Sequence, residues 1–212
     1  MPLSNDDVPE STYFLIGKIV AMTYLLIDCV GCVGNALIVY VTLRSKKLRS
    51  PCNILLGIQA ACDFLMQWNV VGFIHSAYSE SQTTIKTCYW RNVVFTSGLN
   101  FSSMMFLFIA LDRLFLAMKP SAYNSMNPKI YVSWIVFTCF VYSTGIQILF
   151  YFSPGEDLVI CSVTNVANWR FKLIWAICGT VLNVVVIIAY LLLTRKLKSG
   201  LRRYKLNLKL SF

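Results

Sequence analysis

Charged residues are scarce in this sequence. They make up 13% of its 212 residues, against 57% for hydrophobic residues, whereas about a quarter of the residues of a soluble domain are charged. The few charges gather in clusters, and five long stretches between them are almost free of charge: 19–43, 51–78, 92–111, 130–153 and 173–194. About 20 apolar residues let a helix cross a bilayer. The sequence therefore excludes a soluble domain and predicts an all-α membrane protein with five spanning helices.

The sequence also lacks the residue groups that catalysis needs. It has no paired acid and base, no phosphate-binding loop and no nucleophile elbow, and its single histidine is His75. Cys29 and Cys32 have the spacing of a redox or metal-binding pair, but no histidine stands beside them. We therefore expect packing roles for both cysteines and predict no enzyme activity, no cofactor and no metal centre.

The start of the sequence does not have the pattern of a cleaved signal peptide. The segment 1–10 is acidic and polar, without the basic start and the small-residue cleavage site of such a peptide. We expect the first helix to serve as an uncleaved insertion signal. The predicted organisation is an extracellular tail at 1–12, a five-helix membrane portion at 13–194 and a basic cytoplasmic tail at 195–212.

Basic residues accumulate on one side of the predicted bundle. Most of the 19 lysines and arginines fall in 44–49, 113–129 or 195–209, and basic loops stay on the cytoplasmic side of a membrane. This predicts a multi-pass plasma-membrane protein with its amino terminus outside and its carboxyl end in the cytoplasm. A net charge of +10 would also suit nucleic acid. Orientation and contact with anionic inner-leaflet lipid explain the charge more simply, so the bilayer is the expected partner and nucleic acid is not.

Polar groups inside the predicted helices indicate the function. A charged side chain at the centre of a membrane helix costs about 2.5–3.5 kcal/mol on insertion scales and persists where it faces a protein interior or a wet cavity. Such groups and other landmarks follow in this order: Gly34-Asn35, Leu48-Arg49-Ser50-Pro51-Cys52-Asn53, Asp63, Cys88, Asp112-Arg113, Pro120, Tyr123, Trp134, Cys161 and Tyr190. With these residues the chain resembles the rhodopsin-like G-protein-coupled receptors, and most closely the nematode serpentine chemoreceptors of class SX.

The resemblance implies roles for several of these residues. Cys88 and Cys161 would form a disulfide at the outer mouth of the bundle. Asp112 and Arg113 would pair at the cytoplasmic end of the third helix until activation releases the arginine, and Leu114 replaces the tyrosine that usually follows. Pro120 and Tyr123, which follow the third helix, would belong to the same activation motif as Asp112 and Arg113. Tyr190 would lie at the cytoplasmic end of the fifth helix.

The resemblance also implies an intramembrane polar network and a ligand cavity. Asp63, Asn35 and Ser102 would form the network, either simply hydrogen-bonded or with a sodium ion at Asp63 and Ser102. Amine receptors carry an aspartate where this chain has Phe95, so we do not expect an amine held at that position. The expected cavity is apolar with a few hydrogen-bonding groups, and its candidate residues are Asp28, Phe95, Thr96, Leu99 and Asn100. Asp28 alternatively extends to water at its helix end.

The resemblance covers five of the family's seven helices. Nothing after Thr194 is long and apolar enough to span, and the motifs of helices six and seven are missing. We therefore expect a receptor in truncated form: a shortened isoform, a partial gene prediction or a pseudogene product. The implied function is chemosensory, small-ligand or peptide signalling, through heterotrimeric G proteins when complete.

Two alternatives remain open. One is a non-signalling fragment that associates with full-length receptors and retains them in the endoplasmic reticulum. The other is a transporter or channel subunit, which predicts broken helices or an internal repeat. None of the five segments has a midpoint proline and no repeat is visible, so this last alternative ranks below the others.

Overall fold

The computed structural model describes residues 10–45, 50–153 and 157–210, and within them the side chains of 10, 11, 13 and 201–210 are not described. Nearly all of the expected extracellular tail lies outside the described residues. The same holds for Lys46, Lys47 and Arg49 of the first basic loop. The first helix begins at Glu10, so the last residues of the expected tail are already helical.

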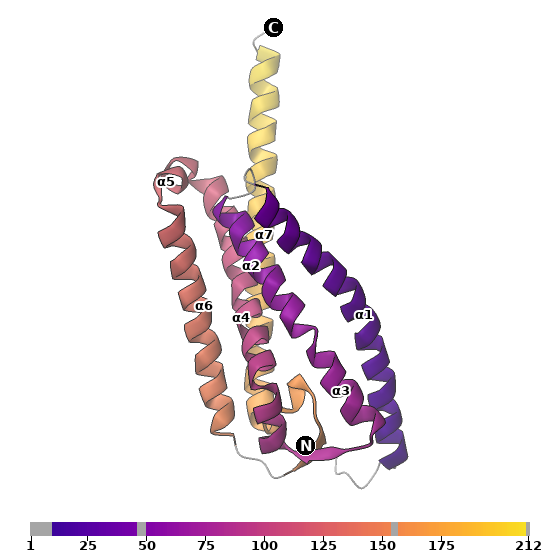
Figure 1. Cartoon of the computed structure of the whole chain (residues 1–212). Helices are drawn as coiled ribbons and strands as arrows, with labels where there is room; N and C mark the ends of the chain where they lie inside the picture. The colour runs from indigo at the N-terminus through magenta and orange to yellow at the C-terminus, as the bar shows by residue number, and fades with distance from the viewer. Residues whose placement is uncertain (1–9, 46–49, 154–156, 211–212) are drawn as a thin grey trace.

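Five apolar spans form a bundle, as predicted (Figure 1). Four of them are single long helices, and the second is a pair of helices. The candidate membrane spans are Phe14–Arg44, Pro51–Tyr78, Ile85–Met118, Pro128–Tyr151 and Trp169–Gly200. In chain order the elements are α1 (Glu10–Arg44), α2 (Pro51–Met66), α3 (Asn69–Tyr78), β1 (Gln82–Thr84), α4 (Ile85–Met118), α5 (Pro120–Ser125), α6 (Pro128–Tyr151), β2 (Leu158–Ile160), the 3₁₀ helix η2 (Val163–Asn165) and α7 (Trp169–Leu210). The protein is therefore a multi-pass membrane protein.

Local sequence sets several of the helix starts. Proline stands at the beginning of α2, α5 and α6, where its missing N–H costs no hydrogen bond. The Asn127 side chain caps α6 by accepting a hydrogen bond from the backbone N–H of Lys129 at 3.0 Å. Thr84 caps α4 in the same way, from Thr87 at 3.4 Å. These caps fix where the spans enter the bundle.

The second span differs from the single helix expected from the sequence. It is divided into α2 and α3 at Gln67 and Trp68, without a proline. The backbone N–H of Gln67 still bonds four residues back, to Asp63 at 3.1 Å, whereas Val70 bonds only three back, to Gln67 at 3.2 Å. This tightening of the hydrogen-bond ladder turns the helix axis, so the chain beyond Asp63 takes a new direction toward β1.

Helix α4 is the central element, in contact with α2, α6 and α7. Midway along it, Met105 and Ile109 pack against Leu55 of α2 and against Ile135 and Cys139 of α6. Large apolar side chains are exposed over the outer surfaces of all five spans. Lipid tails are as apolar as these side chains, so close packing and polar contacts, rather than water exclusion, hold such helices together.

One end of the bundle is crossed by an antiparallel pair of strands, β1 and β2, in which Gln82 pairs with Ile160 and Thr84 with Leu158. The short helix α5 lies at the opposite end (Figure 1). We refer to these as the disulfide end and the α5 end, because the bundle's disulfide lies beside β2.

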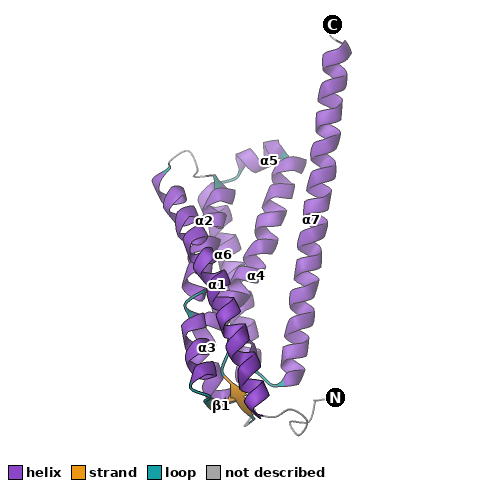
Figure 2. Ribbon diagram, turned by 90° about the vertical axis from the view of Figure 1, so that its right-hand side faces the viewer, coloured by secondary structure: helices purple, strands orange, loops and turns teal. Residues whose placement is uncertain are grey.

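Helix α7 is much longer than the expected span. The sequence predicted a basic tail from residue 195, but the helix continues without a break to Leu210. Figure 2 shows it projecting well beyond α2, α5 and α6 at the α5 end. Its uncharged stretch ends at Thr194, so the basic segment extends the helix away from the bundle.

Candidate functional site

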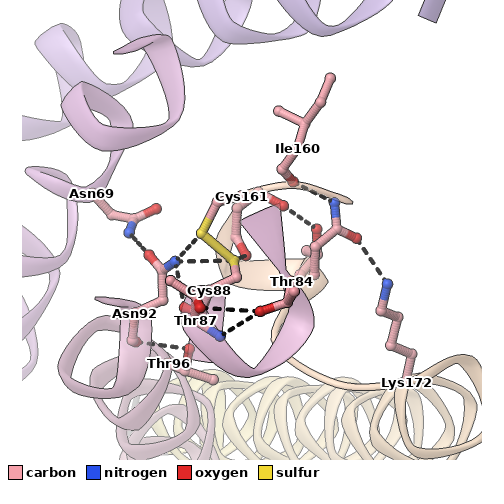
Figure 3. Close-up of a disulfide and its surroundings, with 12 residues drawn as sticks. Asn69, Thr84, Thr87, Cys88, Asn92, Thr96, Ile160, Cys161 and Lys172 are labelled. Carbon is pink, nitrogen blue, oxygen red and sulfur yellow. Dashed lines mark hydrogen bonds between the residues drawn. A yellow bond between two sulfur atoms is a disulfide. The ribbon is translucent and has the colours of Figure 1, made fainter. Parts of the chain in front are cut away.

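The predicted disulfide between Cys88 and Cys161 is confirmed (Figure 3). It joins the first turns of α4 to the segment that follows β2, with the two Cα atoms 5.3 Å apart. Both residues are buried, and Val166, Ala167 and Phe150 pack around them. The disulfide therefore holds the segment after β2 across the end of the bundle.

Asn92 connects the disulfide to two helices. Its side chain is 6% exposed, and its Nδ2 donates to the carbonyl of Cys88 at 3.0 Å and lies 3.0 Å from Cys161 Sγ. Its Oδ1 accepts a hydrogen bond from Asn69, the first residue of α3 (Figure 3). One amide thus links the start of α3, the first turns of α4 and the loop held by the disulfide.

The loop after the disulfide is also tied to α7. Asn165 Nδ2 donates to the carbonyl of Ile160 at 2.9 Å, and Lys172 Nζ donates to Asn165 Oδ1 at 2.8 Å (Figure 3). The loop is therefore fastened at two points, by a covalent bond to α4 and by a charge-assisted hydrogen bond to α7.

Beneath this loop lies a cavity of about 610 Å³ between α1, the α2–α3 pair and α4. Its volume is within the range of small-molecule sites, about 300–1,000 Å³. The walls are largely apolar, and Tyr24 and Phe73 face each other there with ring centroids 6.1 Å apart. The polar groups that line it from the helices are Asp28, Asn35, Asp63, Gln67 and Asn69. We call this space the ligand cavity.

Only two of the five residues predicted for this cavity line it. Asp28 and Leu99 are on its wall, whereas Phe95 lines a different cavity between α3 and α4. Thr96 is fully buried and its hydroxyl donates to the carbonyl of Asn92 at 2.9 Å. Asn100 accepts a hydrogen bond from Trp175 Nε1 of α7 at 2.7 Å. Asn100 is therefore part of the α4–α7 interface.

Asp63 lies in a compact polar cluster between α2 and α4. Ser102 donates to Asp63 Oδ1 at 2.6 Å, and Gln59 donates to Asp63 Oδ2 at 2.9 Å and to the Ser102 hydroxyl. Asn35 lines the same ligand cavity as Asp63, but no hydrogen bond joins them among the described contacts. The polar network that the sequence predicted is thus centred on Gln59, Asp63 and Ser102.

The cluster offers oxygen atoms that suit a sodium ion. Besides the Asp63 carboxylate and the Ser102 hydroxyl, the carbonyl oxygen of the Gln59 side chain is buried without a hydrogen-bond partner. Carboxylate, hydroxyl and amide oxygens are the ligands of hard cations. No group of three or more His, Cys, Asp or Glu side chains that could hold a metal exists among the described residues.

At the α5 end, Asp112 does not pair with Arg113 as the sequence analysis expected. Over the described residues, the ion pair within 4.0 Å is Lys18–Glu80 at the other end of the bundle. Asp112 is fully buried, and its Oδ1 accepts a hydrogen bond from the Tyr123 hydroxyl at 3.0 Å. Adjacent residues on a helix do not face each other, so the carboxylate accepts a hydrogen bond from α5 and forms no ion pair with Arg113 among the described contacts.

The Tyr123 hydroxyl remains a donor because of its surroundings. Burial, and then the negative charge of Asp112, raise the pKa of the Tyr123 phenol well above its usual range. Pro120 begins α5 and so places Tyr123 one turn later, beneath the end of α4. On α7, Tyr190 is exposed, and it makes no side-chain contact with Asp112 or Arg113 among the described contacts.

Sequence reasoning missed Gln59, Gln67, Asn69 and Asn92. Two of them carried a usable signal: Gln59 stands four residues before Asp63, and Asn92 four residues after Cys88, and residues four apart share a helix face. The other two depend on the turn between α2 and α3. Gln67 lines the ligand cavity and Asn69 reaches Asn92 because of that turn. No residue in the sequence predicts the turn.

Comparison with known proteins gives a consistent family assignment. Residues 28–209 match the model of a family described as serpentine type 7TM GPCR chemoreceptor Srsx. This match covers all five spans apart from the first part of α1.

Curated proteins that are similar to the chain include opsins. A melanopsin of Phodopus sungorus is 31% identical over 135 residues, which is 61% of this chain and 27% of that protein. Human melanopsin is 29% identical over 147 residues, 68% of this chain and 30% of that protein. Opsin Rh3 of Drosophila melanogaster is 32% identical over 78 residues, 37% of this chain and 19% of that protein. The matched part therefore spans less than a third of the length of each of these relatives.

Proposed function

The chain belongs to the Srsx family of serpentine seven-transmembrane chemoreceptors, which are G-protein-coupled receptors, and from this we propose that its five spans form the ligand-binding part of a receptor for a small organic cation. The single observation that carries this proposal is the ligand cavity beneath the loop that Cys161 anchors.

The charge of the cavity favours a positively charged ligand. Two carboxylates, Asp28 and Asp63, are on its wall, and no lysine, arginine or histidine is among its lining residues in the described part of the chain. Asp63 already accepts two hydrogen bonds, whereas Asp28 accepts none among the described contacts. Asp28 is therefore the free anion of the cavity.

Two further groups near Asp28 suit an ammonium ion. The rings of Tyr24 and Phe73 lie on the wall at 6.1 Å from each other, and a cation is attracted to the faces of aromatic rings. The carbonyl oxygen of the Gln67 side chain is buried without a partner and would accept a hydrogen bond from N–H. An amine would thus bind on α1 and α3 rather than at Phe95, where amine receptors carry their aspartate.

For the other end of the bundle we propose G-protein contact. Arg113 is half-buried at the end of α4 and free of Asp112. In this arrangement the Asp112–Tyr123 contact orders α5, and Arg113 remains available to a partner. We further propose that the disulfide end lies outside the cell and the α5 end in the cytoplasm of the plasma membrane, in keeping with the basic residues near the α5 end.

Binding of a defined amine tests the ligand class. The purified chain in phospholipid nanodiscs would be heated with 2-phenylethylamine or with 2-phenylethanol, a neutral molecule of the same size. We expect the amine alone to raise the unfolding temperature, and Asp28→Asn to weaken its apparent affinity by about tenfold or more, as loss of a charged hydrogen-bond partner does. Asp157→Asn, which removes a carboxylate in the exposed loop outside the cavity, is the matched control. Equal effects of amine and alcohol, or of the two variants, would refute the cation-binding site.

Binding of a G protein tests the proposed contact. We expect a heterotrimeric G protein to bind the chain in the same nanodiscs, and Arg113→Gln to weaken this binding. Binding that is unaffected by Arg113→Gln, together with co-purification with a full-length receptor of the family, would favour the non-signalling associating protein instead.

A further inference from the structure

A second cavity, of about 370 Å³, opens between α3 and α4 on the bilayer side of the bundle. It shares no wall residue with the ligand cavity except Asn69. Trp68 and Val71 line it and are 60% and 57% exposed, as expected of side chains that face lipid. We call this second cavity the α3–α4 groove.

The groove is polar at its shallow end and apolar at its deep end. Helix α4 runs inward from the disulfide end, so Arg91 lies about 9 Å along it from Ile85 and Phe95 about 15 Å. Helix α3 runs the other way, and Asn69 at its start lies beside Asn92, so Gly72 lies toward the disulfide end and Trp68 toward the middle of the bundle. Charge and apolar surface are therefore separated along the membrane normal.

Among the described residues, Arg91 is the only charged one that lines the groove, and no described acidic group pairs with it. It has no ion pair, hydrogen bond or ring contact among the described contacts, although Lys18 at the same end is paired with Glu80 at 2.7 Å. A guanidinium in this position matches the geometry of a phosphate, which it can bind with two parallel hydrogen bonds.

We propose that the α3–α4 groove binds one phospholipid from the leaflet at the disulfide end, with its phosphate on Arg91 and an acyl chain along Val71, Phe95 and Trp68. A lipid is the occupant because the groove faces the bilayer and because its polar and apolar ends lie at the depths of a headgroup and a chain. If Arg91 only extended its side chain into water, the adjoining apolar groove would have no part in its role.

The bound lipid would stabilise the disulfide end. The inner wall of the groove consists of Asn69, Asn92 and Cys161, the residues that connect the turn of the second span to the disulfide (Figure 3). A chain held in the groove packs against this connection, so its loss would loosen α3 before it affects the α5 end.

Gly72 provides a variant that fills the groove without disturbing the fold. A Cβ atom on Gly72 would meet no atom within 4 Å, so Gly72→Leu places a side chain at the shallow end of the groove, where the headgroup and the start of the acyl chain would lie. Lys86→Gln is the charge-matched control for Arg91→Gln, because Lys86 is exposed on the preceding turn of α4 and does not line the groove.

Native mass spectrometry of the full chain, delipidated in detergent and titrated with dioleoylphosphatidylglycerol or with diolein, tests the proposal. We expect one tightly bound phospholipid and no comparable binding of diolein, which lacks the phosphate. Arg91→Gln and Gly72→Leu should each weaken phospholipid binding about tenfold, whereas Lys86→Gln should leave it unchanged.

Three results would overturn the proposal: equal losses in Arg91→Gln and Lys86→Gln, which would indicate general attraction to a basic surface; full binding by Gly72→Leu; or equal binding of diolein. Unfolding temperatures of the lipid-free proteins show that the variants are folded, and hydrogen exchange of α3 with and without lipid reports the stabilisation directly.

Discussion

The Tyr123 hydroxyl donates a hydrogen bond to Oδ1 of Asp112 at 3.0 Å, and this contact ties the short helix α5 to the end of α4. The other carboxylate oxygen, Oδ2, is buried without a partner. Tyr123 also packs edge-on against Phe115 and Tyr131, with ring centroids 5.9 and 6.1 Å away. Tyr131 and Cys52 also lie close to this carboxylate, and the Tyr123 hydroxyl is its described donor within 3.5 Å.

We expect Tyr123→Phe to lower the free energy of unfolding by about 1–3 kcal/mol, because it removes the 3.0 Å hydrogen bond to a buried carboxylate. The measurement is thermal or denaturant unfolding in detergent micelles. Tyr151→Phe is the control, since Tyr151 is exposed and its hydroxyl makes no described hydrogen bond. If both variants lose the same stability, the hydroxyl of Tyr123 has no special role.

The same contact should depend on pH in the alkaline range. The pKa of the Tyr123 phenol is raised from its ordinary value of 10.0, so ionisation is harder in the folded protein than in the unfolded chain. The stabilisation is complete below pH 10 and is lost as the pH rises toward the folded pKa. The stability difference between the wild type and Tyr123→Phe should therefore be constant from pH 6 to about 9.5 and narrow above pH 10. A difference that widens there would contradict the assignment.

Two adjacent serines on α4 allow a matched test of the Asp63 cluster. Ser102 donates across to Asp63 at 2.6 Å, whereas Ser103 donates to the carbonyl of Leu99 in its own helix at 2.9 Å. We expect Ser102→Ala to cost about 1–2 kcal/mol and Ser103→Ala less than about 0.5 kcal/mol, since hydrogen bonds to a charged group are the stronger ones. Equal costs in chemical unfolding would mean that the cluster does not join α2 to α4 energetically.

Glycine contacts between α1 and α2 give a further prediction. A Cβ on Gly57 would lie 2.9 Å from Cγ2 of Thr42, whereas a Cβ on Gly34 would meet nothing within 4 Å. Small residues let membrane helices approach closely, so Gly57→Leu should separate α1 from α2 and cost about 1–3 kcal/mol. Gly34→Leu should be tolerated, and unfolding temperatures of the two variants decide the point.

Reduction tests the disulfide. Closing a loop of this length with a disulfide stabilises a protein by roughly 4 kcal/mol on the chain-entropy account. We expect dithiothreitol to lower the unfolding temperature of the wild type and to leave the Cys88→Ser/Cys161→Ser double variant unchanged. A similar drop in the double variant would show that reduction acts elsewhere.

The class, the number of spans and the disulfide could be predicted from the sequence, because each depends on features that are local or carried by the family resemblance. Long uncharged stretches define spans whatever their neighbours are. The residues of the ligand cavity could not be predicted equally well. Whether Leu99 or Asn100 faces the cavity depends on how α4 is rotated in the bundle, and one residue changes the direction of a side chain by about 100°.

The expected ion pair of Asp112 and Arg113 was wrong for a related reason. Charge and adjacency in the sequence suggested it, but consecutive side chains diverge on a helix, and the tyrosine of α5 reaches the carboxylate instead. The division of the second span is a different case. It arises from backbone hydrogen bonds at Gln67 and Trp68, for which the sequence carries neither a proline nor a glycine.

Helix α7 continues past its uncharged stretch, from Arg195 to Leu210, and this distance changes how far the membrane can act on it. At a rise of about 1.5 Å per residue these turns span about 22 Å, nearly three times the Debye length of about 8 Å in physiological salt. The electrostatic field of a charged membrane surface therefore acts mainly on the first turns beyond Thr194 and is largely screened at Leu210.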